Sequence, residues 1–372
     1  MKLTISKESL VEQLSHIAGA VEKKQTSKIL ENVLINLTED NLQLVGTDLE
    51  IEMSSNIKIQ AEETGQITAP ARKLHDICKS LPNDCFILLE TNDNRLKIKG
   101  LRSRFELATL PADEFPILDD IPIHQEFMIP ENLLKNLIDN VSFSMANQDV
   151  RYYLNGLFLD YNDTGLTAVA TDGHRLATSH LSSEFIDIED QKNDHLSIII
   201  PRKGILELSR LLDDSCKVPL KLQVSQNHIR IFKDNIRFTS KLIEGKFPDY
   251  QAAIPSSPLH ILDLDREQFR DTLSRVAILS NEKFRGIRIS LSSGLMKLHS
   301  NNPENEIAEE ELDIHYSGDD LDIGFNVTYM LEAINHIEDK IIKLELTSAD
   351  SSALIYSPED TDTRYVVMPI RL

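Results

Sequence analysis

The sequence predicts an α+β protein made of three similar domains, because one order of elements can be followed three times along its 372 residues. A strand, an amphipathic helix, three strands, a second helix and three further strands can be traced from about Met1, again from about Glu126 and again from about Leu259. A repeat of this length has the size of a domain, which excludes a solenoid of short units. We expect the domains at residues 1–120, 121–252 and 253–372.

The first helix of each repeat is predicted by apolar residues that return every three or four positions. We expect these helices at Glu8–Val21, Glu131–Met145 and Glu267–Asn281. The apolar stripes are Leu10, Leu14, Ile17 and Val21; Leu134, Leu137, Ile138 and Val141; and Phe269, Leu273, Val276 and Ala277. Pro130 suits a first helical turn, and Asp265 with Gln268 three positions later resembles a capping box.

Strands are predicted between the helices by short apolar runs that flank turn residues. The hairpin runs are Phe86–Leu89 with Leu96–Lys99, Lys221–Val224 with Ile229–Phe232, and Lys343–Leu346 with Leu354–Tyr356. The second helices are expected at Ala71–Leu81, Arg202–Leu212 and Val327–Ile337. Two of them follow a proline and carry Arg-Lys in the first turn, after Pro70 and after Pro201. Each domain should therefore pack two helices on antiparallel sheet.

Charge is distributed unevenly along the chain. The net charge of −21 argues against wrapping around nucleic acid by attraction alone, since phosphate contacts need Lys and Arg. Glu304–Asp313 is acidic without a basic residue, whereas Arg95–Arg104 is basic. These stretches are either solvated strand edges that discourage aggregation, or surfaces that meet head to tail between two chains and close a ring.

Composition also bounds the location of the protein. The apolar fraction is 41%, no window approaches the run of about 18 apolar residues that a membrane span needs, and the N-terminus lacks an apolar signal core. We therefore expect a cytoplasmic protein. Cys78, Cys85 and Cys216 lack metal-ligand spacing, so we interpret them as small apolar side chains in a reducing compartment.

The segment Thr171-Asp172-Gly173-His174-Arg175 is the most conspicuous candidate for chemistry. Asp, His and Arg in this order are compatible with an enzyme acting on a phosphate ester, but no nucleophile or phosphate-loop motif lies nearby. The alternative is a turn in which Gly173 takes an unusual backbone angle and hydrogen bonds hold its neighbours. Gly46-Thr47-Asp48-Leu49-Glu50 echoes it in the first repeat, which favours an architectural role for the Thr-Asp pair.

Two further segments are candidates for binding. Gln148–Tyr153 places Arg151 beside Tyr152 and Tyr153, a pattern that contacts phosphate or stacks on bases, or else forms a loop anchored by aromatic residues. The apolar chain end Tyr365–Leu372 is either a final strand or a docking surface, and Pro369 should end any ladder there.

Motifs over the whole chain resemble those of the bacterial DNA polymerase III beta subunit family, the sliding clamps. The most specific are Gly46–Glu50, Pro70–Lys73, Ser103–Pro116, Gln148–Gly156, Ala170–Ala177, Ile200–Gly204, Phe238–Tyr250, Ala277–Gly286, Gly324–Tyr329 and Val366–Leu372. The resemblance implies the DNA clamp fold, a head-to-tail homodimeric ring around duplex DNA. It implies a non-catalytic processivity factor for which no cofactor or metal is expected.

The resemblance also implies three sets of site residues. DNA-facing positions would be Lys24, Arg72, Gln148, Arg151, Tyr152, Tyr153 and Lys203. The dimer contact would use Arg102, Arg104, Phe105, Leu107, Ile278, Leu279, Glu304 and Glu306. A groove for partner peptides would use Leu154, Thr171, Gly173, His174, Arg175, Leu176, Pro248, Asn326, Tyr329, Ser352, Val366, Val367, Met368, Pro369, Ile370, Arg371 and Leu372.

The partners implied by the family are the DNA polymerase III alpha subunit, the clamp loader and repair or translesion polymerases, which bind through short linear peptides. The sequence departs from the family pattern at two places. Ala252 and Ala253 stand where a bulkier, often basic rim is usual, so peptide preference should differ on that side. The stretch Glu22–Lys28 around Lys24 also differs, which weakens the case for a DNA contact there.

Overall fold

The computed structural model describes residues 1–21, 27–118, 121–189 and 195–371. Backbone contacts separate the chain into two compact units. Unit 1 comprises Met1–Asn132, Ile186–Asn193 and Lys203–Leu242, and unit 2 comprises Leu133–Phe185, Asp194–Arg202 and Ile243–Leu372. Every strand pairing recorded between described residues is antiparallel, as the sequence predicted.

Unit 1 contains a four-stranded sheet and a nine-stranded sheet. The smaller sheet runs in the order β1 (Lys2–Ser6), β6 (Phe86–Asn92), β7 (Arg95–Gly100) and β8 (Ser103–Ala108). The larger runs in the order β13 (Asp187–Glu189), β9 (Gln125–Pro130), β15 (Pro219–Val224), β16 (His228–Lys233), β17 (Ile236–Lys241), β4 (Ile51–Lys58), β3 (Asn41–Thr47), β2 (Asn32–Leu37) and β5 (Gly65–Pro70). Pairing of β17 with β4 joins the middle of the chain to its first third.

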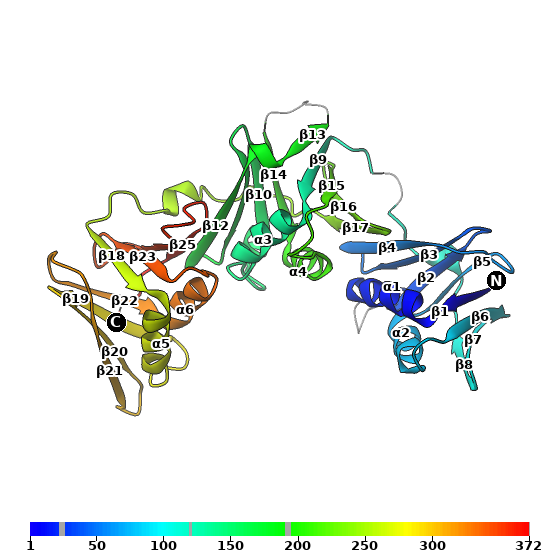
Figure 1. Cartoon of the computed structure of the whole chain (residues 1–372), viewed down its shortest axis with the longest axis horizontal. Coiled ribbons are helices and arrows are strands. Elements are labelled where there is room, and N and C mark those ends of the chain that lie inside the picture. Colours follow the sequence, from blue (N-terminus) through cyan, green and yellow to red (C-terminus); the bar gives the residue numbers. More distant parts are fainter. Residues whose placement is uncertain (22–26, 119–120, 190–194, 372) are drawn as a thin grey trace. The chain divides into compact units, whose positions relative to one another are not determined.

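Two helices of unit 1, α1 (Lys7–Ala20) and α2 (Ala71–Ser80), lie side by side, and α1 covers β3 and β4 (Figure 1). Helix α4 (Arg202–Leu211) belongs to the same unit from Lys203 onward. Short 3-10 turns occur at Lys28–Glu31 and Ala112–Glu114. At Gly46 an added Cβ would lie 2.7 Å from Ile17 Cγ2, so the glycine of the predicted motif lets α1 approach β3 closely.

Unit 2 contains an eight-stranded sheet and a second four-stranded sheet. The larger runs in the order β14 (Leu196–Pro201), β10 (Gly156–Asn162), β11 (Gly165–Thr171), β12 (Arg175–Ser182), β25 (Arg364–Val367), β24 (Ala353–Tyr356), β23 (Ile341–Leu346) and β18 (His260–Asp265). The smaller runs in the order β21 (Ile307–Asp313), β20 (Leu295–Asn301), β19 (Gly286–Ser292) and β22 (Leu321–Asn326).

Helices α5 (Arg266–Ala277) and α6 (Val327–Asn335) of unit 2 pack against each other, and α3 (Glu131–Ser142) belongs to this unit from Leu133 onward (Figure 1). Further 3-10 turns are Tyr152–Leu154, Ser183–Phe185 and Gln251–Ala253. Asp265 caps α5 by accepting a hydrogen bond from the amide of Gln268 at 3.0 Å, which confirms the predicted start.

The predicted threefold order of elements is confirmed with one correction. Each repeat has four strands, not three, between its two helices, because β5, β14 and β22 lead directly into α2, α4 and α6. Pro70 and Pro201 are the last residues of β5 and β14, so they end a strand where the sequence suggested only a helix start. The middle repeat also carries the short edge strand β13.

The six predicted helices are confirmed; α3 and α5 end three and four residues earlier than expected, and the other four end one or two residues early. The chain leaves α3 at Ser142 and α5 at Ala277. In both places the next amides bond three residues back, from Ser144 to Val141 and from Ser280 to Ala277, which closes the helix in a tighter turn. All twelve residues of the three predicted apolar stripes are buried.

All three cysteines are free thiols. Cys78 and Cys85 are buried free thiols, and Cys216 is half-buried. Burial raises the pKa of Cys78 to about 12, so this thiol stays protonated at neutral pH. None of the described helices is both long and apolar enough to cross a membrane.

We predict that the folded protein has one rapidly reacting thiol, that of Cys216, because burial restricts reagent access to Cys78 and Cys85 and also disfavours the thiolate of Cys78. Titration with a colorimetric disulfide reagent should give about one fast equivalent and three after unfolding. Cys216→Ser should remove the fast phase, whereas a fast phase that survives in this variant would contradict the assignment.

Candidate functional site

The pairing of β12 with β25 brings together two segments that the sequence singled out. Arg175 pairs with Val367 and Leu176 with Val366 in an antiparallel register. The ladder then continues for one more bond, from the Met368 amide to the His174 carbonyl at 2.9 Å. The interpretation of the chain end as a final strand is confirmed as far as Val367, and Met368–Arg371 continue beyond it outside any strand.

The segment Thr171–Arg175 is a tight turn held by its own side chains. Asp172 Oδ1 accepts from the amides of His174 (2.9 Å) and Arg175 (3.0 Å). Thr171 Oγ1 accepts from the Gly173 amide at 3.1 Å and donates to the Arg175 carbonyl at 2.5 Å. Gly173 has φ +85°, as the turn interpretation requires.

The first repeat contains the same turn, which confirms the architectural role of the Thr-Asp pair. Asp48 Oδ1 accepts from the amides of Glu50 (2.9 Å) and Ile51 (2.8 Å), and Thr47 Oγ1 accepts from Leu49 at 3.0 Å. Leu49 occupies the position of Gly173 with φ +77°. A leucine in this conformation is strained by its Cβ, so the two turns share a backbone but differ in local stability.

Arg151 lies directly against Gly173. A Cβ on Gly173 would lie 2.8 Å from the terminal nitrogens of Arg151. The guanidinium donates to both carboxylate oxygens of Asp149, at 3.0 and 2.9 Å, and to the Asp172 carbonyl at 3.1 Å. These bonds lower the pKa of Asp149 to about 2. The loop that carries Arg151 is thus fixed on the turn.

Arg175 links the turn to α6. Its guanidinium donates to Asp172 Oδ2 at 3.1 Å and to the Phe143 carbonyl at 2.7 Å, and it forms an ion pair with Glu332. It also lies over the ring of Tyr329, 4.7 Å from the centroid. No local sequence pattern indicates Glu332 or Phe143 as partners, because both are remote from Arg175 along the chain.

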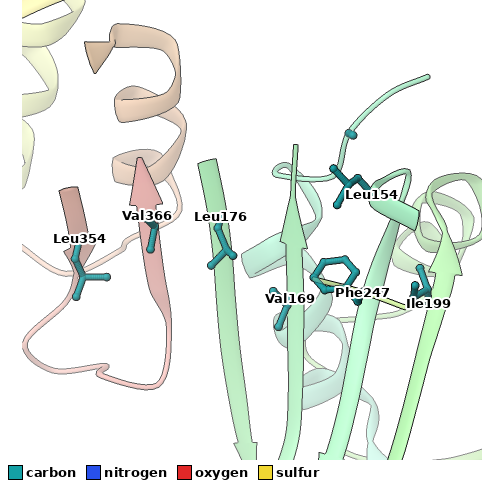
Figure 2. Packing of buried hydrophobic residues seen from close by; sticks show 8 residues of the cluster. Leu154, Val169, Leu176, Ile199, Phe247, Leu354 and Val366 are labelled. Carbon is teal, nitrogen blue, oxygen red and sulfur yellow. The ribbon is translucent and has the colours of Figure 1, made fainter. Parts of the chain in front are cut away.

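Several predicted groove residues form one apolar cluster within unit 2, which Figure 2 shows. The buried members are Ala146, Leu154, Val169, Leu176, Ile199, Phe247, Leu354 and Val366. Leu154, Leu176 and Val366 were predicted; the other five were not, since each reads locally as an ordinary core residue of a strand or loop. Tyr153, Tyr250 and Ala253 pack against the cluster while staying partly exposed.

The remaining predicted groove residues differ in their contacts and in their exposure. His174 is exposed and its ring stacks at 6.5 Å from that of Tyr329. Asn326 caps α6, accepting from the amides of Thr328 and Tyr329. The Ile370 amide donates to the Gly324 carbonyl at 2.8 Å. Pro248 is exposed beside Phe247, Thr171 and Val367 are buried, Ser352, Pro369 and Ile370 are half-buried, and Met368 and Arg371 are exposed. Leu372 lies outside the described residues.

The predicted DNA-facing residues fall into two groups. One loop of unit 2 carries Gln148, Arg151, Tyr152 and Tyr153. The side chain of Asn155 holds this loop, because its Oδ1 accepts from the Asp149 amide and its Nδ2 donates to the Asp149 carbonyl, both at 2.8 Å. Tyr152 is 57% exposed there, so it is open to a ligand rather than anchored. Arg72 and Lys203 belong to unit 1, where Arg72 donates to the Val21 carbonyl at 2.9 Å and Lys203 forms an ion pair with Asp48. Lys24 lies outside the described residues.

The predicted dimer-contact residues lie on or near two sheet edges. β8, with Arg104, Phe105 and Leu107, is the last strand of one four-stranded sheet, and Arg102 precedes it. β21 is the last strand of the other, with Glu304 and Glu306 just before it. Ile278 is 76% exposed, and Leu279 is half-buried.

Three family models match the chain in succession: the N-terminal domain of the DNA polymerase III beta subunit at residues 1–119, the central domain at 128–249 and the C-terminal domain at 251–371. The chain belongs to the DNA polymerase III beta subunit family. The predicted family and its three-domain clamp fold are thereby confirmed.

Relatives of known name match over the full length. The beta sliding clamp of Pseudomonas aeruginosa is 47% identical and that of Escherichia coli (strain K12) 42% identical, each covering 100% of both chains. A crystal structure of the DNA polymerase III subunit beta from Pseudomonas aeruginosa superposes with a TM-score of 0.95 at 46% identity over 100% of both chains. The DnaN sliding clamp of the same organism bound to griselimycin gives 0.94 at 47% identity, also over 100% of both chains.

We predict opposite effects of two substitutions in the matched turns. Gly173→Ala should lower the free energy of unfolding by about 1–2 kcal/mol, because it adds a Cβ in the left-handed region and displaces Arg151. Leu49→Gly should raise it by up to about 1 kcal/mol, since it removes the same strain from a half-exposed side chain.

Denaturant unfolding of the two variants beside the parent chain tests this pair. Equal destabilisation by both substitutions would mean that the backbone angle is not what distinguishes the two turns.

Proposed function

We propose that this chain is a DNA sliding clamp: two copies close head to tail into a ring that encircles duplex DNA and tethers the replicative polymerase. The observation that carries the proposal is the full-length match to all three beta-subunit domains and to curated clamps. We keep the domain division at residues 1–120, 121–252 and 253–372, and we place the protein in the bacterial cytoplasm.

Retention in this function is topological. Non-specific protein–DNA contacts have a Kd of roughly 10⁻⁴–10⁻⁶ M at physiological salt, too weak to hold an enzyme on its template. A closed ring does not need tight contacts, so a net charge of −21 is compatible with the role. We assign weak, sequence-independent DNA contacts to Arg72, Gln148, Arg151, Tyr152, Tyr153 and Lys203, and also to Lys24.

The ring would form through the two open sheet edges. β8 presents the exposed Arg104 and follows the exposed Arg102, and β21 follows the exposed Glu304 and Glu306. Pairing of these edges between chains would cover the unpaired backbone groups of both strands. Part of the acidic charge is already neutralised within the chain, because Arg275 binds Glu310 at 2.7 and 3.1 Å.

Partner peptides would bind over the apolar cluster and the turn, between β12, α6 and the chain end. The partners in question are the DNA polymerase III alpha subunit, the clamp loader and repair or translesion polymerases. An extended peptide with one or two apolar anchors and a Kd near a micromolar gains about −8 kcal/mol, which suits exchange between partners. The small Ala252 and Ala253 leave this rim without a basic side chain.

The proposed role is not catalytic. Both carboxylate oxygens of Asp172 accept hydrogen bonds, from amides of the turn and from the Arg175 guanidinium. Arg175 also donates to the Phe143 carbonyl and forms an ion pair with Glu332. Only His174 of the Asp-His-Arg set is exposed, and it has no oriented nucleophile in this segment. The binding function accounts for the motif without turnover.

We predict that the loaded protein stays on circular DNA and leaves when that DNA is cut once. Gel filtration of loader-treated complexes before and after linearisation measures this directly. A variant truncated after Val367, which lacks only the residues beyond β25, should lose both loader-dependent retention and stimulation of the polymerase, because the loader and the polymerase share the proposed peptide site. Equal retention on circular and linear DNA would falsify encirclement.

We predict that Arg104→Glu weakens the dimer by about tenfold or more, since it sets a carboxylate against an acidic partner edge. Sedimentation at nanomolar concentration measures the dimer fraction. Arg95→Glu is the matched control, with the same charge change at an exposed position of the inner strand β7. An unchanged dimer in Arg104→Glu would refute the proposed contact.

A further inference from the structure

A polar cavity of about 280 Å³ opens on the eight-stranded sheet of unit 2. It lies outside every set of site residues assigned above. The lining residues that matter here are Thr167, Thr178, His180, Tyr250, Asp362 and Arg364. Hydroxyls, an imidazole and a guanidinium in one cavity of this size suit a single polar side chain rather than a large ligand.

The cavity continues the face of the sheet that carries the apolar cluster. Leu176, Thr178 and His180 are alternate residues of β12, so their side chains share one face. Val366 and Arg364 share a face of β25 in the same way. Tyr250 completes the link, because it packs against the apolar cluster and also lines the cavity.

Hydrogen-bond donors of the cavity are left available for a ligand. Arg364 donates from Nε to the Thr361 carbonyl at 2.9 Å, and no ion pair recorded among the described residues engages its guanidinium. His180 Nδ1 lies 3.0 Å from Thr167 Oγ1. When that hydroxyl donates to Nδ1, the ring proton sits on Nε2, which then becomes a second donor.

Negative groups near the cavity are mostly committed elsewhere. The pKa of Tyr250 is raised by burial and also by the negative charge of Asp160. Asp160 Oδ1 accepts a hydrogen bond from the Ser197 hydroxyl at 2.8 Å and lies 3.0 Å from His195 Nε2. Asp249, the other carboxylate that acts on Tyr250, is exposed. Asp362 is the one carboxylate in the lining, so it opposes an anionic ligand and sets the sign of a control experiment.

We propose that this cavity is an accessory subsite for an acidic side chain, Asp or Glu, of the partner peptide. The inference rests on the proposed peptide-binding function and adds a charge preference to it. From Leu176 to His180 is four strand residues, on the order of 13 Å, so the acidic residue falls about two to four positions from the apolar anchor. Charge-assisted hydrogen bonds from Arg364 would select a carboxylate over an amide.

Synthetic peptides test the subsite with the full-length protein. One peptide carries two adjacent apolar anchors with Glu two to four residues away, on either side in separate versions; its match carries Gln at the same position. By fluorescence polarisation at low salt, the Glu peptide should bind about fivefold tighter in at least one placement. Arg364→Gln should abolish this difference and leave the Gln peptide unchanged.

Two further variants fix the interpretation. Arg288→Gln removes an exposed arginine from β19, in the other sheet of unit 2, and should preserve the preference. Asp362→Asn should enlarge it, because the opposing carboxylate is gone. Equal binding of all Glu and Gln versions to the parent protein would overturn the subsite alone. Failure of every peptide to bind would instead overturn the proposed peptide site, and the subsite with it.

Discussion

The candidate site depends on the pairing of β12 with β25, which makes one sheet from the middle and the end of the chain. The register sets Leu176 against Val366 and Arg175 against Val367. Without it, the apolar cluster would lose its contributions from β24 and β25, and Met368 would have no partner at His174. An antiparallel ladder also fixes which face each residue takes, since a shift by one residue would turn every side chain over.

The charged groups around that ladder mainly hold neighbouring segments of the chain together. The guanidinium of Arg175 bonds to Asp172, Phe143 and Glu332. The guanidinium of Arg151 bonds to Asp149 and to the turn. The partly buried Arg175 keeps elements in place in this way, because removing one partner would leave the other unsatisfied, whereas Arg151 is exposed. Side chains that remain partly exposed are Tyr153, Tyr250 and Ala253, which pack against the buried apolar cluster, and beside the cluster lies the cavity lined by His180 and Arg364. That division is compatible with the peptide-binding role proposed above.

Much of this architecture was predictable from local patterns. The helices α1, α3 and α5 were found because their stripes, such as Leu10, Leu14 and Ile17, repeat at helical spacing, and the turn at Gly173 was found from its residue types. The fourth strand of each repeat was missed because β5, β14 and β22 run without a break into a helix, so no turn signal separates them. The helices α3 and α5 end early because their last turns are tighter, and no residue type in the sequence predicts those turns.

Contacts between residues that are far apart along the chain could not be predicted from local sequence patterns. Glu332 and Phe143 meet Arg175 only after folding, and Ile199 and Phe247 join the apolar cluster from segments that read as plain core. The ion pair between Lys203 and Asp48 likewise depends on the fold, and the motif that contains Lys203 does not indicate it. Family resemblance supplied the grouping of these segments, while the structure supplied the bonds that hold them.

Amide hydrogen exchange at the chain end tests the central pairing most directly. In the free, full-length protein, the Met368 amide should exchange at least about a hundredfold more slowly than in an unstructured peptide, which corresponds to an opening free energy of about 2.7 kcal/mol. Arg371, exposed and beyond the ladder, should exchange at close to the peptide rate. Rapid exchange at Met368 together with Tyr365 and Val367 would show that β25 is not joined to β12, and would contradict the account.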